Sequence, residues 1–293
     1  MKKLRYLIPF LLAAVLISCE REIEIDLPND EDLVVVEGRI RPGESPVILL
    51  TRNRGFFDAV PTDLEEFVNE FVIQDAQVIV SDGTQSEELQ LTFDILHYPY
   101  IYYTGTVVKG EIGKTYSLSI NYNNKVLTAE TTIPNNVAID TSWFGLNPFD
   151  INEDSLGVSY LQIIDPDTFG NAYRLYAKKN SELQFFAVSG SEFNDDFING
   201  NNVPFFAGSS DTPLAAQDSF IPQEYFYSLG DTIYLELANI GRKEYNFYAT
   251  LGAALNSNGN PFASPTLVQS NIDGGLGVWV GMSVSYDTVY ATN

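Results

Sequence analysis

The sequence predicts an all-β protein, in which an N-terminal immunoglobulin-like or transthyretin-like β-sandwich precedes a second β-rich domain with one amphipathic helix. Short runs of β-branched and aromatic residues recur about every ten residues, with glycine, proline, aspartate and asparagine between them. Seven or so such strands in the first half are typical of a sandwich. Only one long stretch has the spacing of a helix.

The N-terminus has the order of an export signal. Basic residues at positions 2, 3 and 5 precede an apolar run from Leu7 to Ile17. This run is much shorter than the roughly 20 residues that cross a bilayer. We therefore expect residues 1–18 to be a signal peptide rather than a permanent membrane span.

Ser18 and Cys19 follow this run, and residues 16–19 resemble the lipobox at which bacterial lipoproteins are cleaved and lipidated. It is the only cysteine in the chain, so no disulfide can form within the chain. We expect Cys19 to carry the acyl chains that anchor the protein to a membrane, with a plain cleaved signal and an incidental cysteine as the alternative.

Residues 19–29 form an acid-rich tether behind the expected anchor. Acidic residues at this place resemble the surface-export signal of Bacteroidota lipoproteins, which predicts a lipid-anchored protein on the cell surface of the outer membrane. The alternative is a solvated linker that like charges keep extended. The acidic residues concerned are Glu20, Glu22, Glu24 and Asp26.

The composition is strongly acidic, with 39 Asp and Glu against 16 Lys and Arg and a formal net charge of -23. A field of this sign repels nucleic acid, and the sequence has no basic stripe, so nucleic acid is not an expected partner. A hydrophobic fraction of 45% supports packed cores rather than disorder. The length favours two domains.

The first domain is expected over residues 30–135. A helix is predicted for Thr62 to Glu70, because Thr62 and Glu65 have the spacing of a capping box. Asp82-Gly83 predicts a tight hairpin turn. Strands are expected at 33–40, 47–50, 76–80, 89–93, 101–103, 116–122 and 126–133.

The second domain is expected over residues 136–293, after the boundary signal Pro134-Asn135-Asn136. A helix is predicted near 241–255 from an apolar stripe, and a long polar surface excursion is predicted at 189–219. The stripe consists of Tyr245, Tyr248, Leu251 and Leu255. Strands are expected at 138–144, 157–164, 172–177, 184–188, 231–237, 277–281 and 283–290.

Catalytic motifs are absent from the sequence. His97 is the only histidine, so no multi-histidine metal site can form, and there is no Gly-x-Ser-x-Gly nucleophile elbow. Gly274-Gly275-Leu276-Gly277 lacks the lysine and hydroxyl residue of a phosphate-binding loop. We therefore expect no enzyme, although two converging carboxylates could still hydrolyse a glycan.

Two acidic clusters offer hard oxygen ligands near glycines, which suits calcium. Neither has the EF-hand spacing, and a solvated turn is the alternative that we favour. No other cofactor is expected. The candidate ligands are Asp165 and Asp167 in one cluster and Asp195 and Asp196 in the other.

Three aromatic runs could stack on sugars or anchor a partner protein, although most such residues in a β-rich chain point into the core. They cover residues 98–103, Phe205-Phe206 and 225–227.

Seven segments spread along the chain form a known pattern. They are the lipobox and tether, 34–40, 75–78, 113–118, 129–134, 260–263 and 270–277. Together they resemble the Bacteroidota lipoproteins grouped as domain of unknown function 4249. The resemblance covers nearly the whole chain after the signal and implies an outer-membrane lipoprotein that accompanies a TonB-dependent receptor. It supplies no catalytic residues.

The expected function is therefore non-enzymatic: a surface lipoprotein that assists a TonB-dependent transporter by capturing a small ligand or glycan, or by docking on the receptor. An extracellular carboxylate-dependent glycan hydrolase and a purely structural or adhesive envelope module are the alternatives.

Overall fold

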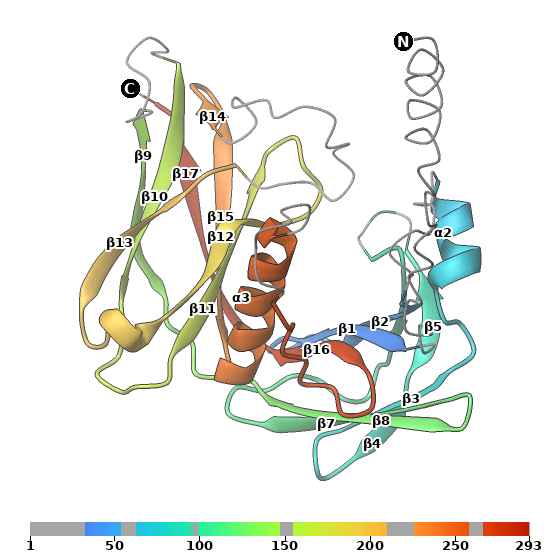
Figure 1. Ribbon diagram of the computed structural model, residues 1–293. Helices are drawn as coiled ribbons and strands as arrows, with labels where there is room; N and C mark the ends of the chain where they lie inside the picture. Colours follow the sequence, from blue (N-terminus) through green and yellow to red (C-terminus); the bar gives the residue numbers. More distant parts are fainter. Residues whose placement is uncertain are drawn as a thin grey trace, which may run out of the picture. The chain divides into compact units, whose positions relative to one another are not determined.

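Strands make up most of the structure, a computed structural model that describes residues 33–53, 63–94, 96, 99–146, 155–209, 226–257 and 266–292 (Figure 1). These residues all belong to one compact unit over 32–293. Four sheets and two α-helices are present in the described part, and the predicted all-β class is confirmed. None of the helices in this part is both long and apolar enough to cross a membrane.

The first half of the chain forms two sheets that pack face to face. One has the strand order β16-β1-β2-β6-β5, and the other has the order β4-β3-β7-β8. The strands of the first are β1 (Val34–Ile40), β2 (Val47–Arg52), β5 (Gln90–Phe93), β6 (Ile101–Thr104) and β16 (Leu276–Gly281). Those of the second are β3 (Gln77–Ser81), β4 (Ser86–Glu88), β7 (Thr115–Tyr122) and β8 (Lys125–Thr132).

Inward-facing residues of these sheets form the first core. Buried residues alternate with more exposed ones along β1, β3, β7 and β8, as a half-buried strand requires. The core also contains Trp279 from β16, which is fully buried and whose Nε1 donates to the Tyr116 carbonyl at 3.1 Å. A residue from near the C-terminus therefore completes the core of the first half.

The second half forms two further sheets. One pairs β10 with β9, β13 and β14, and the other has the order β12-β11-β15-β17. Their apolar faces form a second core, whose residues come from the part of the chain between Val137 and Ala291. The strands are β9 (Ile139–Leu146), β10 (Leu156–Ile164), β11 (Ala172–Lys179), β12 (Phe186–Asn194), β13 (Asn202–Ala207), β14 (Tyr227–Ser228), β15 (Thr232–Ile240) and β17 (Ser283–Tyr290).

Both predicted helices are present. Helix α2 (Leu64–Phe71) begins two residues later than expected, and its cap is Asp63, whose carboxylate accepts the Glu66 N–H at 2.8 Å. Thr62, the expected cap, lies outside the described residues. A 3₁₀ turn, η1 (Asp195–Phe197), follows β12.

Helix α3 (Arg242–Ser257) corresponds to the predicted helix near 241–255 and lies beside β11, β12 and β16 (Figure 1). Three members of the expected stripe pack against a third apolar cluster, but Leu255 is 65% exposed. Phe247 and Glu244 are the most buried side chains of the helix. The apolar face is therefore rotated from the one that the stripe predicted.

The predicted polar excursion at 189–219 is wrong for its first part. Residues 189–194 extend β12, which pairs with β11, and β13 pairs with β10 along six residue pairs. The asparagines and glycines that suggested a loop lie in and around η1, between these strands. Residues 210–219 lie outside the described part.

The expected boundary at 134–136 lies between the two cores, because Ile133 belongs to the first and Val137 to the second. The chain returns to the first sheet through β16, which is parallel to β1 over six residue pairs. The Asp82-Gly83 turn is confirmed, with Gly83 at φ 84° between the antiparallel strands β3 and β4.

Candidate functional site

Strand alternation places positive charge where two sheets turn their outer faces toward each other. Even-numbered residues of β1 face the first core, so Arg39 points to the other side of its sheet. Odd-numbered residues of β11 face the second core, so Arg174 and Lys178 also point away from it. The outer face of the sheet with β1 and the outer face of the sheet with β11 therefore meet in one layer between the two sheets.

Helix α3 fills part of this layer with apolar side chains, which pack on Val278 and Val280 of β16 and on Ala238 of β15. Beside the helix a cleft of about 490 Å³ remains, which we name the interlayer cleft. Its lining residues are Glu37, Gly38, Arg39, Arg41, Val47, Pro99, Arg174, Tyr176, Lys178, Leu183, Gln184, Phe185, Phe186, Ala187, Glu236, Tyr248, Val280 and Met282.

The charges of the interlayer cleft are the reverse of those of the chain. Four cationic side chains line it, and only two carboxylates, Glu37 and Glu236, do so. The whole chain has 39 acidic and 16 basic residues. A quarter of all its basic residues therefore lie around one cleft.

Arg41 and Glu236 form an ion pair between β15 and the residue that follows β1. Nη1 and Nη2 of Arg41 donate to Oε2 and Oε1 of Glu236 at 3.1 and 2.6 Å, and the Glu236 side chain is fully buried. Burial acts to lower the pKa of Arg41, but the carboxylate beside it raises that pKa overall. The pair neutralises itself and holds the two halves of the chain together.

Arg174 is held by aromatic rings. Its guanidinium lies 3.5 Å from the ring centroid of Tyr248 and 5.2 Å from that of Tyr176, which are cation–π distances. Its Nε donates to Ser191 Oγ at 3.4 Å. Burial raises the pKa of the Tyr248 hydroxyl, so this ring remains a neutral support.

Lys178 lies next to three apolar side chains of the interlayer cleft, Leu183, Phe185 and Phe186, which we name the apolar wall. The Lys178 ammonium lies 5.1 Å from the ring centroid of Phe185 and 5.4 Å from that of Tyr234. Phe186 and Leu183 extend this apolar side, and Leu183 is 76% exposed. The cleft thus joins cationic groups to an apolar wall, as ligand pockets commonly do.

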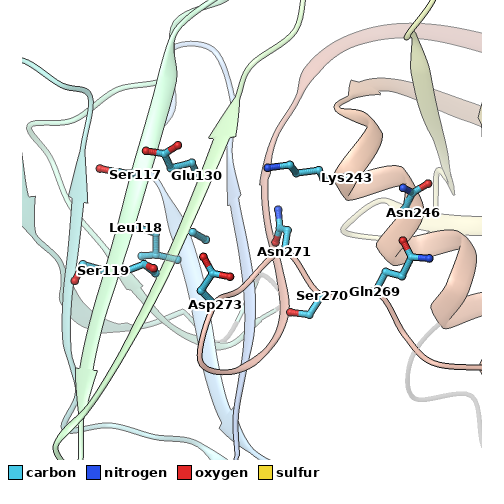
Figure 2. A pocket seen from close by; sticks show the side chains of 12 residues that line it. Ser117, Leu118, Ser119, Glu130, Lys243, Asn246, Gln269, Ser270, Asn271 and Asp273 are labelled. Carbon is cyan, nitrogen blue, oxygen red and sulfur yellow. The ribbon is translucent and has the colours of Figure 1, made fainter.

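A second, larger hollow of about 590 Å³ lies between α3 and the sheet that contains β7 and β8 (Figure 2). Its lining is mainly hydroxyl, amide and charged groups. They are Ser117, Leu118, Ser119, Thr128, Ala129, Glu130, Lys243, Asn246, Gln269, Ser270, Asn271 and Asp273. We name this the polar hollow.

Several groups at the polar hollow have structural partners. Asn271 Nδ2 donates to the Trp279 carbonyl at 2.8 Å and to Glu244 Oε1 at 3.2 Å, and its Oδ1 accepts the Trp279 N–H. Thr131 Oγ1 donates to the same Glu244 oxygen at 2.8 Å. Burial raises the pKa of Glu244. This network fixes α3 to β8 and β16 beneath the hollow.

The two acidic clusters of the sequence come together in the structure. Asp165 N donates to the Asn201 carbonyl, and Asp195 N donates to the Asn171 carbonyl, both at 3.1 Å. Among the described residues no group of three or more His, Cys, Asp or Glu side chains could hold a metal ion. The calcium hypothesis for Asp165, Asp167, Asp195 and Asp196 stays a prediction.

The carboxylates of these clusters have protein partners. Asp195 accepts the N–H groups of Gly170 and Asn171 at 2.7 Å each, and also a bond from Arg242. Asp196 accepts a second Arg242 bond at 2.8 Å. Asp165 accepts the Tyr173 hydroxyl. From the residues that the structure describes, Asp167 accepts a long contact from Asn199 Nδ2, at 3.5 Å, and no shorter one.

The aromatic runs are divided between core and surface. Ile101, Tyr103 and Tyr227 are buried, and Phe205 stacks on Phe193 with ring centroids 4.1 Å apart. Phe206 is 64% exposed. Cys19, the acidic residues of the tether, His97, Tyr98 and Tyr225 lie outside the described residues.

The sequence reading missed the cations of the interlayer cleft. A usable signal was present in β11, where Arg174 and Lys178 interrupt an apolar strand at positions of the same parity. Basic residues are scarce in this chain, so two of them on one face of a buried strand are informative. The contribution of β1 was hidden, because no local pattern links residue 39 to residue 174.

No family model and no curated protein matches this chain. The resemblance to the Bacteroidota lipoproteins of domain of unknown function 4249 therefore stays a prediction. The geometry of the interlayer cleft is the firmer basis for a functional proposal.

Proposed function

We propose that the protein is a non-enzymatic, lipid-anchored outer-membrane protein that captures a small solute in the interlayer cleft for a TonB-dependent receptor. The observation that carries the capture role is the cleft itself. It is about 490 Å³ in volume, within the range of small-molecule sites, and combines an apolar wall with a few convergent charged groups.

The walls of the interlayer cleft are well fixed, which supports binding without a large rearrangement. The Arg41–Glu236 ion pair joins β15 to the residue that follows β1. On the same strand β15, Asn239 Oδ1 accepts the Val137 N–H at 3.0 Å, which ties the start of the second half to β15. The parallel pairing of β16 with β1 makes the same connection through the backbone. A preorganised site loses less free energy to ordering when it binds.

The place of action is supported by sequence alone. The export signal and Cys19 favour a lipid anchor, and the acidic residues from Glu20 to Asp26 favour the cell surface. The resemblance stated above favours a TonB-dependent receptor as partner. Protease treatment of intact cells should degrade the protein. Protein that survives this treatment would contradict the surface location.

Solute capture is tested by native mass spectrometry of the full chain purified from its membrane. We expect a small molecule to remain bound, and Arg174→Gln to release it, while the matched variant Lys179→Gln on the same strand should retain it. The proposal would be contradicted if the purified chain carries no small molecule and if deletion of its gene leaves solute uptake through the receptor unchanged.

Glycan hydrolysis remains the second candidate, and one observation favours it. Glu130 and Asp273 both line the polar hollow, and glycoside hydrolysis uses a pair of carboxylates (Figure 2). This candidate requires that Glu130→Gln and Asp273→Asn each abolish the release of reducing ends from a polysaccharide panel. Release that persists in both variants would exclude these residues.

A further inference from the structure

The interlayer cleft also indicates the chemical class of its ligand. We infer that it binds an organic anion with a flat apolar body, the anionic group against Arg174 and its neighbouring cations and the body against Phe185 and Phe186. This inference rests on the proposed capture role and deepens it.

The charge of the interlayer cleft selects for an anion. The Arg41–Glu236 pair is internally neutral, which leaves the three cations Arg39, Arg174 and Lys178. Two further carboxylates are near them: Glu37 in the lining, and Glu192, which lies opposite Arg174 in the neighbouring strand β12. The Arg39 side chain makes no hydrogen bond or ion pair with any residue that the structure describes. A neutral ligand would remove water from these cations and return no charge, which is unfavourable.

The setting of Arg174 favours a planar, two-oxygen group. Its guanidinium lies against the Tyr248 ring, so its plane is fixed, and its Nε is directed to Ser191. Planar guanidinium groups match carboxylates and similar anions through paired N–H donors, and a stacked one loses little freedom on binding. A carboxylate satisfies this geometry.

The apolar wall requires a body beyond the charged group. Leu183, Phe185 and Phe186 form one side of the interlayer cleft, and Val47, Pro99 and Met282 contribute further apolar surface. A bare inorganic anion would leave these side chains in contact with water. A ring on them would gain roughly 25 cal/mol per Å² of apolar surface buried.

The size of the interlayer cleft limits the ligand. A volume of about 490 Å³ fits a single small molecule. The lining has two more cations than carboxylates, and Glu192 beside Arg174 reduces this excess to one, which matches a single negative charge rather than a polyphosphate. A neutral saccharide would use neither the cations nor the apolar wall fully.

Calorimetry with three matched probes tests the inference on the full chain purified in detergent. Naphthoate has both features, naphthamide has the same shape without the charge, and acetate has the charge without the ring. We expect naphthoate to bind at least tenfold more tightly than naphthamide, and acetate not to bind measurably. Equal affinity for naphthoate and naphthamide would overturn the inference.

Variants locate the binding. Arg174→Gln should lower the naphthoate affinity at least tenfold, and Arg174→Lys should recover part of the loss. Phe185→Leu should weaken naphthoate and naphthamide alike. Lys179→Gln, on the same strand but outside the cleft, should change neither, and melting curves should show that every variant is folded. An unchanged affinity in folded Arg174→Gln would overturn the inference.

The inference and the capture proposal fail in different ways. If a small molecule purifies with the chain and depends on Arg174, but is neutral, then the anion inference fails and capture stands. If no molecule purifies with the chain and none of the three probes binds, both fail.

Discussion

At the scale of single residues, a few buried polar groups determine how the layers meet. Glu244 is 4% exposed, and its Oε1 accepts bonds from Thr131 and Asn271. Thr131 Oγ1 in turn accepts the Gly281 N–H at 2.8 Å. One carboxyl thus connects α3, β8 and β16.

Glu244 should make stability depend on pH. Burial is the main cause of its raised pKa, so the folded state binds the proton more tightly than the unfolded state does. Stability should therefore fall as pH rises from the ordinary value of 4.5 through the raised pKa, and recover on acidification.

Glu244→Gln should remove this dependence, because its amide oxygen can still accept from Thr131 and Asn271 without titrating. We expect the midpoint of thermal unfolding, followed by circular dichroism, to vary less with pH in the variant than in the wild type. Glu130→Gln, at an exposed position of β8, is the control and should follow the wild type. Parallel curves for all three proteins would contradict this role of Glu244.

At the scale of elements, β16 depends on glycine where it runs beside β1. Gly277 has φ 107°, and a Cβ at this position would lie 1.9 Å from the Val36 carbonyl oxygen. Gly38, on β1, faces the ring of Trp279, and a Cβ there would lie 2.8 Å from the Trp279 Cε3 atom. The close approach of the two strands therefore requires residues without side chains.

Gly277→Ala should be severely destabilising, by more than about 3 kcal/mol, because backbone strain adds to a clash with backbone atoms. Gly43→Ala is the matched control: it also has positive φ, at 79°, but a Cβ there meets nothing within 4 Å. We expect the control to cost about 1 to 2 kcal/mol. Urea denaturation measures both, and equal costs would show that Gly277 has room for a methyl group.

The elements themselves were largely predictable. A β-branched run located β1, period-two patterns located β3 and β7, and Asp82-Gly83 located the turn between β3 and β4. The end of β12 and the whole of β13 were wrongly predicted as a polar loop, because the asparagines and glycines around them were given more weight than their strand pattern. Pairing with β11 and β10 stabilises these strands, and such pairing is not visible in local composition.

At the scale of the whole molecule, the first half should be incomplete without the C-terminal segment. Residues 30–135 alone lack β16 and would leave the space of Trp279 in the first core empty. Loss of a buried tryptophan of this kind costs about 3 to 5 kcal/mol. This is a large part of the stability of a typical domain.

A fragment of residues 30–135 should therefore give poorly dispersed amide signals in NMR and unfold without a cooperative transition. The same fragment with residues 270–281 joined by a flexible Gly/Ser linker should recover dispersion and cooperativity. A well-dispersed spectrum from the shorter fragment would show that the first half folds without β16.

Only a small part of the candidate site could be predicted from the sequence, namely that Arg174 and Lys178 share one face of β11. Arg39 is far from them in the chain, and the three cations become a site only because the outer faces of two sheets meet. The acidic clusters around Asp165 and Asp195 were noticed because they are local. In the structure both of these carboxylates accept protein hydrogen bonds.

The all-β class, the position of most strands and the two helices could be predicted from neighbouring residues in the chain, and the same kind of local pattern predicts a lipid anchor at Cys19. The pairing of β16 with β1 and the gathering of four basic residues around one cleft became visible only in the folded chain. Contacts between residues far apart in the chain depend on how whole faces pack. A period of two along a strand shows which side is apolar, but not which sheet will cover it.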